Sequence, residues 1–192
     1  MDGHRSTYDA IVLAGGAGSR LGGPDKPDQA VGGRSMLEAV VDSVAGARRI
    51  IVVGPQRTAI RGVRWALEQP PGGGPVAAVA AGVPLVREPV TLLLAADLPF
   101  VAAAIEPLQT ALQPDDDAVA LADRAGRINF LAAAWWTRRL RAAVWALADP
   151  ADRPMRALGI PRAVPDPAGW GDDCDTPEQL AAARIRAGEE HA

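Results

Sequence analysis

Short apolar runs alternate with longer mixed segments along the chain. Uninterrupted apolar runs predict buried strands over 9–14, 49–54, 90–96 and 117–122. The segments between them predict helices over 35–47, 76–85, 102–112, 137–148 and 176–186. Weaker apolar stretches lie at 62–66, at 129–135 and, as a short edge strand, at 162–164. This alternation predicts a parallel or mixed sheet with helices on both faces.

Two of the predicted helices carry recognisable N-terminal signals. Ser35 is followed three residues later by Glu38, which is the spacing of a capping box. Thr176 precedes Pro177 and is followed three residues later by Gln179, so either Thr176 or the neighbouring Asp175 is expected to cap the last helix.

Composition limits the classes of protein that fit. With 192 residues, of which 48% are hydrophobic, one domain over 1–192 is expected, with flexible tails at 1–7 and 188–192. The net charge of -3 argues against a nucleic-acid binder. A single cysteine, the lack of an apolar N-terminal segment and the lack of a long apolar run favour a cytoplasmic protein without a membrane span.

A glycine-rich segment follows the first predicted strand, and it reads GGAGSRLGGPDK over 15–26. Glycines after a strand allow backbone N–H groups to approach a phosphate closely. Arg20 and Lys26, the latter the only lysine of the chain, add positive charge suited to a triphosphate or departing pyrophosphate. The segment lacks the Gly-Lys-Ser/Thr of a P-loop, and Arg20 stands where a dinucleotide fingerprint needs its third glycine.

Acidic residues follow two other predicted elements. Asp97 ends the 90–96 strand, where it is well placed to hold Mg²⁺ or, alternatively, to act as a turn or cap residue. Asp173 alternates with Asp175 on an extended segment, so Asp173 could reach a metal ion held by Asp97. The Trp135–Trp136 pair lies in an apolar run and is expected in the core, and Cys174 has no histidine partner in a visible motif.

These segments together resemble the nucleotidyltransferases that act on small phosphorylated acceptors, and among them the molybdenum cofactor guanylyltransferases. The resemblance rests on Leu13–Gly16 with Ser19-Arg20 and Asp25-Lys26, on Asp97-Leu98-Pro99, and on the supporting segments Gly33–Leu37, Gly74–Ala77 and Asp173–Glu178. It covers nearly the whole chain.

The resemblance implies a three-layer α/β/α Rossmann-like nucleotidyltransferase fold with a mostly parallel mixed sheet. It also implies a reaction and a set of site residues. The terminal phosphate of molybdopterin would attack the α-phosphate of GTP, with Mg²⁺ required and pyrophosphate released. Arg20, Lys26 and Asp97 would be catalytic, and Asp97 with Asp173 would bind the metal. The nucleotide would be bound by Leu13, Ala14, Gly15, Gly16, Gly18, Ser19, Lys26, Gly54, Glu68, Gly74 and Pro75. Contact with proteins that deliver or accept the cofactor is a further expectation.

The chain departs from the family pattern in two places. Glu68-Gln69 stands where guanine-specific members often carry an aspartate, so Glu68 is the candidate to accept hydrogen bonds from guanine. Asn129-Phe130 stands where members often carry His or Gln before Pro, facing the acceptor, and Arg153 and Arg156 could meet the acceptor phosphate or lie solvated on the surface. Cytidylyl transfer, another phosphorylated acceptor and an inactive nucleotide-binding regulator therefore stay open as alternatives.

Overall fold

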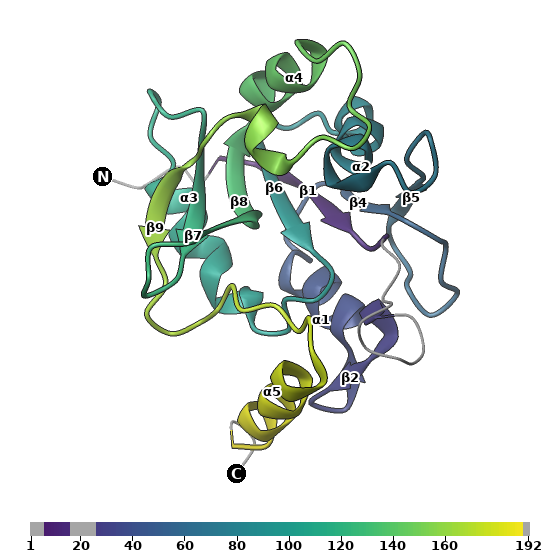
Figure 1. Cartoon of the computed structure of the whole chain (residues 1–192), viewed down its shortest axis with the longest axis vertical. Coiled ribbons are helices and arrows are strands. Elements are labelled where there is room, and N and C mark those ends of the chain that lie inside the picture. The colour runs from purple at the N-terminus through teal and green to yellow at the C-terminus, as the bar shows by residue number, and fades with distance from the viewer. Residues whose placement is uncertain (1–5, 16–25, 190–192) are drawn as a thin grey trace.

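The computed structural model describes residues 6–15 and 26–189 (Figure 1). Of the residues expected in the nucleotide site, Gly16, Gly18, Ser19 and Arg20 lie outside these ranges. None of the helices within the described ranges is long and apolar enough to cross a membrane.

A seven-stranded mixed sheet forms the centre of the described structure, with the order β5-β4-β1-β6-β8-β7-β9. Its strands are β1 (Tyr8–Leu13), β4 (Ile50–Val53), β5 (Arg64–Ala66), β6 (Val90–Ala95), β7 (Ala118–Ala122), β8 (Ile128–Trp136) and β9 (Arg162–Pro165). Strand β8 runs antiparallel to both β6 and β7, and the other neighbouring strands pair in parallel. The weak strand near 62–66 and the edge strand near 162–164 are both confirmed.

Helices cover both faces of this sheet, as the strand–helix alternation predicted. The α-helices are α1 (Met36–Ser43), α2 (Gly74–Gly82), α3 (Ile105–Ala111), α4 (Thr137–Trp145) and α5 (Pro177–Glu189). The 3₁₀ helices are η1 (Lys26–Asp28), η2 (Val83–Leu85), η3 (Val101–Ala104) and η4 (Met155–Leu158), and a separate hairpin joins β2 (Ala30–Val31) to β3 (Arg34–Ser35).

Side-chain alternation along the central strands creates two hydrophobic cores. Ala10 and Val12 of β1 pack into the core that contains α1 and α3, whereas Ile11 and Leu13 pack into the core that contains α2 and α4. Successive side chains of a strand point to opposite faces, so one strand supplies both layers. Trp135 is buried in the second core, which confirms its expected packing role.

Helix α5 lies apart from these two cores and packs on the β2–β3 hairpin (Figure 1). A third hydrophobic cluster joins them, made of Val31, Met36, Cys174, Leu180, Ala183 and Ala187. Arg184 Nε also donates to the Ala30 carbonyl oxygen at 2.9 Å. This packing fixes the segment that precedes α5, and that segment carries Asp173 and Asp175.

Several expected boundaries are wrong, and the reasons are local. Helix α1 ends at Ser43 instead of 47, because turns at Ala45 and Ala47 replace the helical pattern. Helix α2 begins at Gly74 instead of Val76 and continues into a 3₁₀ turn at Pro84.

The other helices also differ in extent. The helix expected over 102–112 divides into η3 and α3, and α4 ends at Trp145 instead of 148. Helix α5 reaches Glu189, so the expected flexible tail does not begin at 188. The β2–β3 hairpin and η4 were not expected at all.

Candidate active site

The carboxyl ends of β1 and β6 meet at one edge of the sheet. Leu13 pairs with Ala95 in a parallel register, and Ala96 N donates to the Leu13 carbonyl oxygen at 3.0 Å. The glycine loop that follows β1 and the aspartate that follows β6 therefore start side by side. Ligands of open α/β sheets bind at such an edge, and the structure brings Gly15, where the glycine-rich segment begins, and Lys26, where it ends, to the edge that carries Asp97.

Gly54 brings the end of β4 against the start of the glycine loop. It has a φ of +147°, and a Cβ atom there would lie 2.7 Å from the Ala14 carbonyl carbon and 2.8 Å from Gly15 N. No larger side chain fits such a close approach. The lack of a side chain at Gly54 thus allows the end of β4 to pack directly against the Ala14–Gly15 backbone.

Glu68 lies across from the same backbone. A Cβ atom built on Gly15 would lie 3.5 Å from Glu68 Oε1, and that oxygen also accepts a hydrogen bond from Gly72 N at 3.2 Å. Because α2 follows β5 through the short loop that contains Gly72, the start of α2 at Gly74-Pro75 belongs to the same edge of the sheet. The structure places Glu68 close enough to Gly15 to share a ligand with it.

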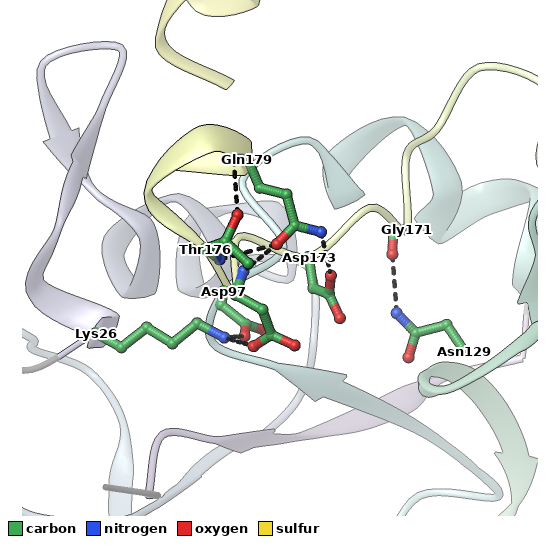
Figure 2. Close-up of polar contacts among 8 residues, drawn as sticks. Lys26, Asp97, Asn129, Gly171, Asp173, Thr176 and Gln179 are labelled. Carbon is green, nitrogen blue, oxygen red and sulfur yellow. Dashed lines mark hydrogen bonds and ion pairs between the residues drawn. The ribbon is translucent and has the colours of Figure 1, made fainter. Parts of the chain in front are cut away.

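The ammonium group of Lys26 lies between two carboxylates (Figure 2). Its Nζ contacts Asp97 Oδ2 and Asp175 Oδ1. The side chains of Lys26 and Asp97 are each 16% exposed, so this ion pair is partly shielded from water. Burial alone would lower the pKa of Lys26, but the attraction of Asp97 and Asp175 outweighs it and raises the pKa. The lysine is therefore a permanent cation at neutral pH.

Asp175 and Thr176 have separate tasks at the start of α5. Thr176 Oγ1 accepts from Gln179 N at 3.2 Å, and Gln179 Oε1 accepts from the Thr176 backbone N at 2.9 Å, which is a capping box. The expectation that either residue caps the helix is thus correct for Thr176 and wrong for Asp175, whose carboxylate binds Lys26 instead. Asp175 is the partner of Lys26 that the sequence did not reveal.

Asp173 belongs to the same electrostatic group. Burial, followed by repulsion from Asp175 and Asp97, raises its pKa, although Lys26 opposes the shift. Gln179 Nε2 lies 3.4 Å from Asp173 Oδ1 (Figure 2). Asp97, Asp173 and Asp175 thus form an acidic group that faces a single lysine among the described residues, and further positive charge would stabilise it.

Among the described residues, one carboxylate oxygen of Asp97 is free to bind a metal ion. Its Oδ1 is buried and has no hydrogen-bond partner among the described residues, and an unpaired buried carboxylate oxygen is unfavourable. Within the same residues no group of three or more His, Cys, Asp or Glu side chains could hold a metal ion. Mg²⁺ commonly takes one or two carboxylates together with substrate phosphates, and Asp97 with Asp173 fits that pattern.

A pocket of about 730 Å³ opens beside Asp173. It lies between β7, β8, the segment before α5 and α5 itself. Its lining includes Asn129, Asp173 and Arg186. Asn129 Nδ2 donates to the Gly171 carbonyl oxygen at 2.8 Å (Figure 2), so Asn129 holds the wall of the pocket in place. Arg153 and Arg156 are exposed and are not among the described residues that line this pocket.

Cys174 contributes packing to this region. It is buried in the cluster beneath α5. Burial raises the pKa of its thiol to about 11, so the sulfur is protonated at neutral pH and is a poor nucleophile.

Comparison with known proteins shows which family the chain belongs to. The family described as "MobA-like NTP transferase domain" matches residues 10–162. A protein of Rhodopseudomonas palustris (strain HaA2) named molybdenum cofactor guanylyltransferase is 34% identical over 151 residues, which cover 70% of this chain and 71% of the relative.

Two solved structures share the fold. A nucleotidyl transferase from Methanothermobacter thermautotroptrophicus superposes with a TM-score of 0.77 at 20% identity, covering 96% of this chain and 99% of that one. The molybdopterin-guanine dinucleotide biosynthesis protein A from Archaeoglobus fulgidus gives a TM-score of 0.66 at 16% identity, covering 94% and 99%. With the family match over most of the chain, these relationships show that the chain is a nucleotidyltransferase that belongs to the MobA-like NTP transferase family, together with the molybdenum cofactor guanylyltransferases.

Proposed function

We propose that the protein transfers GMP from GTP to the terminal phosphate of molybdopterin. An oxygen of that phosphate attacks the α-phosphorus of GTP, the bond between the α-phosphorus and its bridging oxygen to the β-phosphate breaks, and pyrophosphate leaves. The observation that carries the proposal is the group of Lys26, Asp97 and Asp175 at the joint end of β1 and β6, beside a pocket large enough for an acceptor.

The residues of the chain would act by positioning and by charge. The backbone from Leu13 to Gly15 would approach the phosphates, and Lys26 would neutralise the charge that develops on the departing pyrophosphate. Arg20 would assist from within the glycine loop. Reactions of this type need little covalent help, because alignment and charge stabilisation supply most of the acceleration.

Mg²⁺ is the metal that the acidic group would hold. Asp97, with its unpaired buried Oδ1, and Asp173 would be the ligands, and the ion would neutralise negative charge on the phosphates. Asp175, which pairs with Lys26, would stay available as an alternative second ligand.

The base and the acceptor would lie on opposite sides of this centre. Glu68, next to Gly15, would accept hydrogen bonds from guanine N1–H and the 2-amino group, and the start of α2 at Gly74-Pro75 would border the base. The pocket beyond Asp173 would take the molybdopterin. The cytoplasmic location and contacts with cofactor-delivering or cofactor-accepting proteins remain predictions.

The decisive experiment measures pyrophosphate release with each of the four nucleoside triphosphates, with and without molybdopterin, and identifies the product by mass spectrometry. Molybdopterin-dependent release with GTP and a product heavier by one GMP unit is expected. Release with CTP alone would establish cytidylyl transfer instead. Release that requires a different phosphorylated acceptor would identify that molecule, instead of molybdopterin, as the substrate. Tight nucleotide binding without any turnover would identify a nucleotide-binding regulator.

A further inference from the structure

Arg57 links the two described ends of the glycine loop. Its Nε donates to Asp28 Oδ1 at 2.7 Å, and its Nη1 donates to the Pro55 carbonyl oxygen at 3.0 Å and lies 3.5 Å from the Ala14 carbonyl oxygen. Ala14 directly follows β1, whereas Asp28 ends the 3₁₀ helix that begins with Lys26. A single guanidinium group therefore contacts the chain just before the glycine loop and just after it.

This contact differs from an ordinary surface ion pair. The Arg57 side chain is only 11% exposed, although its partner Asp28 is 46% exposed. In a similar pair elsewhere, the arginine Arg34 is 51% exposed and Asp42 is 65% exposed. Exposed pairs contribute little to stability because water and salt screen them. A shielded guanidinium with several acceptors in fixed directions instead holds its partners in a defined geometry.

We propose that Arg57 is a positioning residue that acts through Asp28 to hold Lys26 at the nucleotide site. The turn at 26–28 is short, so a shift of Asp28 moves Lys26 relative to Asp97. Holding that turn against Ala14 keeps the lysine near the phosphate-binding end of β1. The inference rests on the proposed function, because it takes Lys26 as the residue that binds the nucleotide phosphates.

If Arg57 contacted the nucleotide directly, substitution of Asp28 would have a different effect on GTP binding. If Arg57 itself bound phosphate, removing the charge of Asp28 would leave nucleotide binding unchanged or improve it, since the guanidinium would be released from a competing anion. If Arg57 acts through Asp28, removing either member of the pair should have the same effect. The sign of the Asp28 effect therefore separates the two roles.

The test compares Arg57→Gln, Asp28→Asn and the double variant with the wild type, using the dissociation constant for GTP with Mg²⁺ and the KM and kcat of the transfer reaction. Each single variant is expected to weaken GTP binding and raise the KM about 5- to 20-fold with little change in kcat, and the double variant to add almost nothing. Arg57→Lys should not restore binding, because the compact ammonium group of a lysine lacks the rigid planar fork that holds acceptors in fixed directions.

A second cycle connects Arg57 to Lys26. In the Lys26→Ala background, Arg57→Gln should have almost no further effect on GTP affinity, because the group that it positions is gone. Arg162→Gln is the matched control, since it removes a two-contact arginine–aspartate pair with Asp116 at the opposite edge of the sheet, and its GTP affinity should equal that of the wild type.

Three results would overturn the inference: a normal GTP affinity in Asp28→Asn, additive effects of Arg57→Gln and Lys26→Ala, or a restored affinity in Arg57→Lys. These results leave the proposed function standing as long as Lys26→Ala weakens GTP binding. A normal GTP affinity in Lys26→Ala would remove the proposed nucleotide site and this inference together. If Arg57→Gln does not fold, as thermal unfolding will show, Asp28→Asn at the half-exposed partner decides the question.

Discussion

The ammonium group of Lys26 contacts the carboxylate of Asp97, although 71 positions separate the two residues in the chain. One follows the glycine loop after β1 and the other follows β6, and the parallel pairing of these strands brings them together. Asp175 completes the contact from the other end of the sequence. The charge arrangement in this group yields direct predictions.

Asp97→Asn should nearly abolish transfer while leaving the fold intact. The substitution removes the charge of a residue whose Oδ1 is buried and without a partner among the described residues, and a lost site of charge stabilisation typically costs about 100-fold or more in kcat. Pyrophosphate release and thermal unfolding measure the two effects. Asp175→Asn, which removes the other carboxylate that contacts Lys26, is the control and should lose less activity. Wild-type Mg²⁺-dependent rates in Asp97→Asn would refute the metal assignment.

Lys26→Gln should have opposite effects on the two proposed ligands. GTP binding should weaken by roughly 1.5–3 kcal/mol, as expected for the loss of a charged hydrogen bond. Free Mn²⁺, used in place of Mg²⁺, should bind about tenfold more tightly, because the metal no longer competes with an ammonium group for Asp97 and Asp175. Isothermal titration and electron paramagnetic resonance measure these affinities.

The control for this substitution is Lys26→Arg, which keeps the charge and should keep the weak binding of free Mn²⁺. An unchanged GTP affinity in Lys26→Gln would remove the lysine from the nucleotide site. An unchanged Mn²⁺ affinity would mean that the metal does not share carboxylates with Lys26.

Glu68→Gln should reduce the preference for GTP over ATP by about tenfold, because the amide cannot accept two hydrogen bonds from guanine as a carboxylate does. The ratio of kcat/KM for the two nucleotides measures the preference. Glu88→Gln, whose partner Arg49 also pairs with Asp9 away from the site, is the control. Equal discrimination by Glu68→Gln and the wild type would assign base recognition to another group.

Gly54→Ala should destabilise the protein and displace the start of the glycine loop. The added Cβ would lie 2.7 Å from the Ala14 backbone at a φ of +147°, and strain of this kind costs about 1–3 kcal/mol. Gly62→Ala separates the two causes, because Gly62 also has a positive φ but no atom within 4 Å of the added Cβ. Thermal unfolding should show a loss in both variants, whereas only Gly54→Ala should raise the KM for GTP.

Cys174 should resist alkylation in the folded protein. With a pKa raised to about 11, only about one thiol in a thousand is ionised near pH 8, and the thiolate is the reactive form. Iodoacetamide labelling should be slow in buffer and fast in concentrated guanidinium chloride. Labelling that becomes fast above about pH 10 without loss of structure would agree with this pKa, and rapid labelling at neutral pH would contradict the buried position of Cys174 beneath α5.

The local pattern of the sequence was enough to predict most elements of the fold. Strands of continuous apolar character such as 90–96 and the Ser35–Glu38 capping box were both correctly placed, because burial and capping depend on residues that are near each other in sequence. The ends of α1, α2 and α4 were less accurate, since the last turn of a helix depends on turns and packing that follow it. The β2–β3 hairpin carried too little periodicity to be recognised.

By itself, the sequence determined that a glycine loop with one lysine follows the first strand and that Asp97 follows another strand. It also carried the resemblance to the molybdenum cofactor guanylyltransferases. Only the tertiary structure decided that Asp175 binds Lys26, that Arg57 and Asp28 join the two described ends of the loop, and that a pocket opens beyond Asp173. These contacts join residues far apart in the chain, and they depend on strand register and on the packing of α5 against the hairpin, which no local pattern encodes.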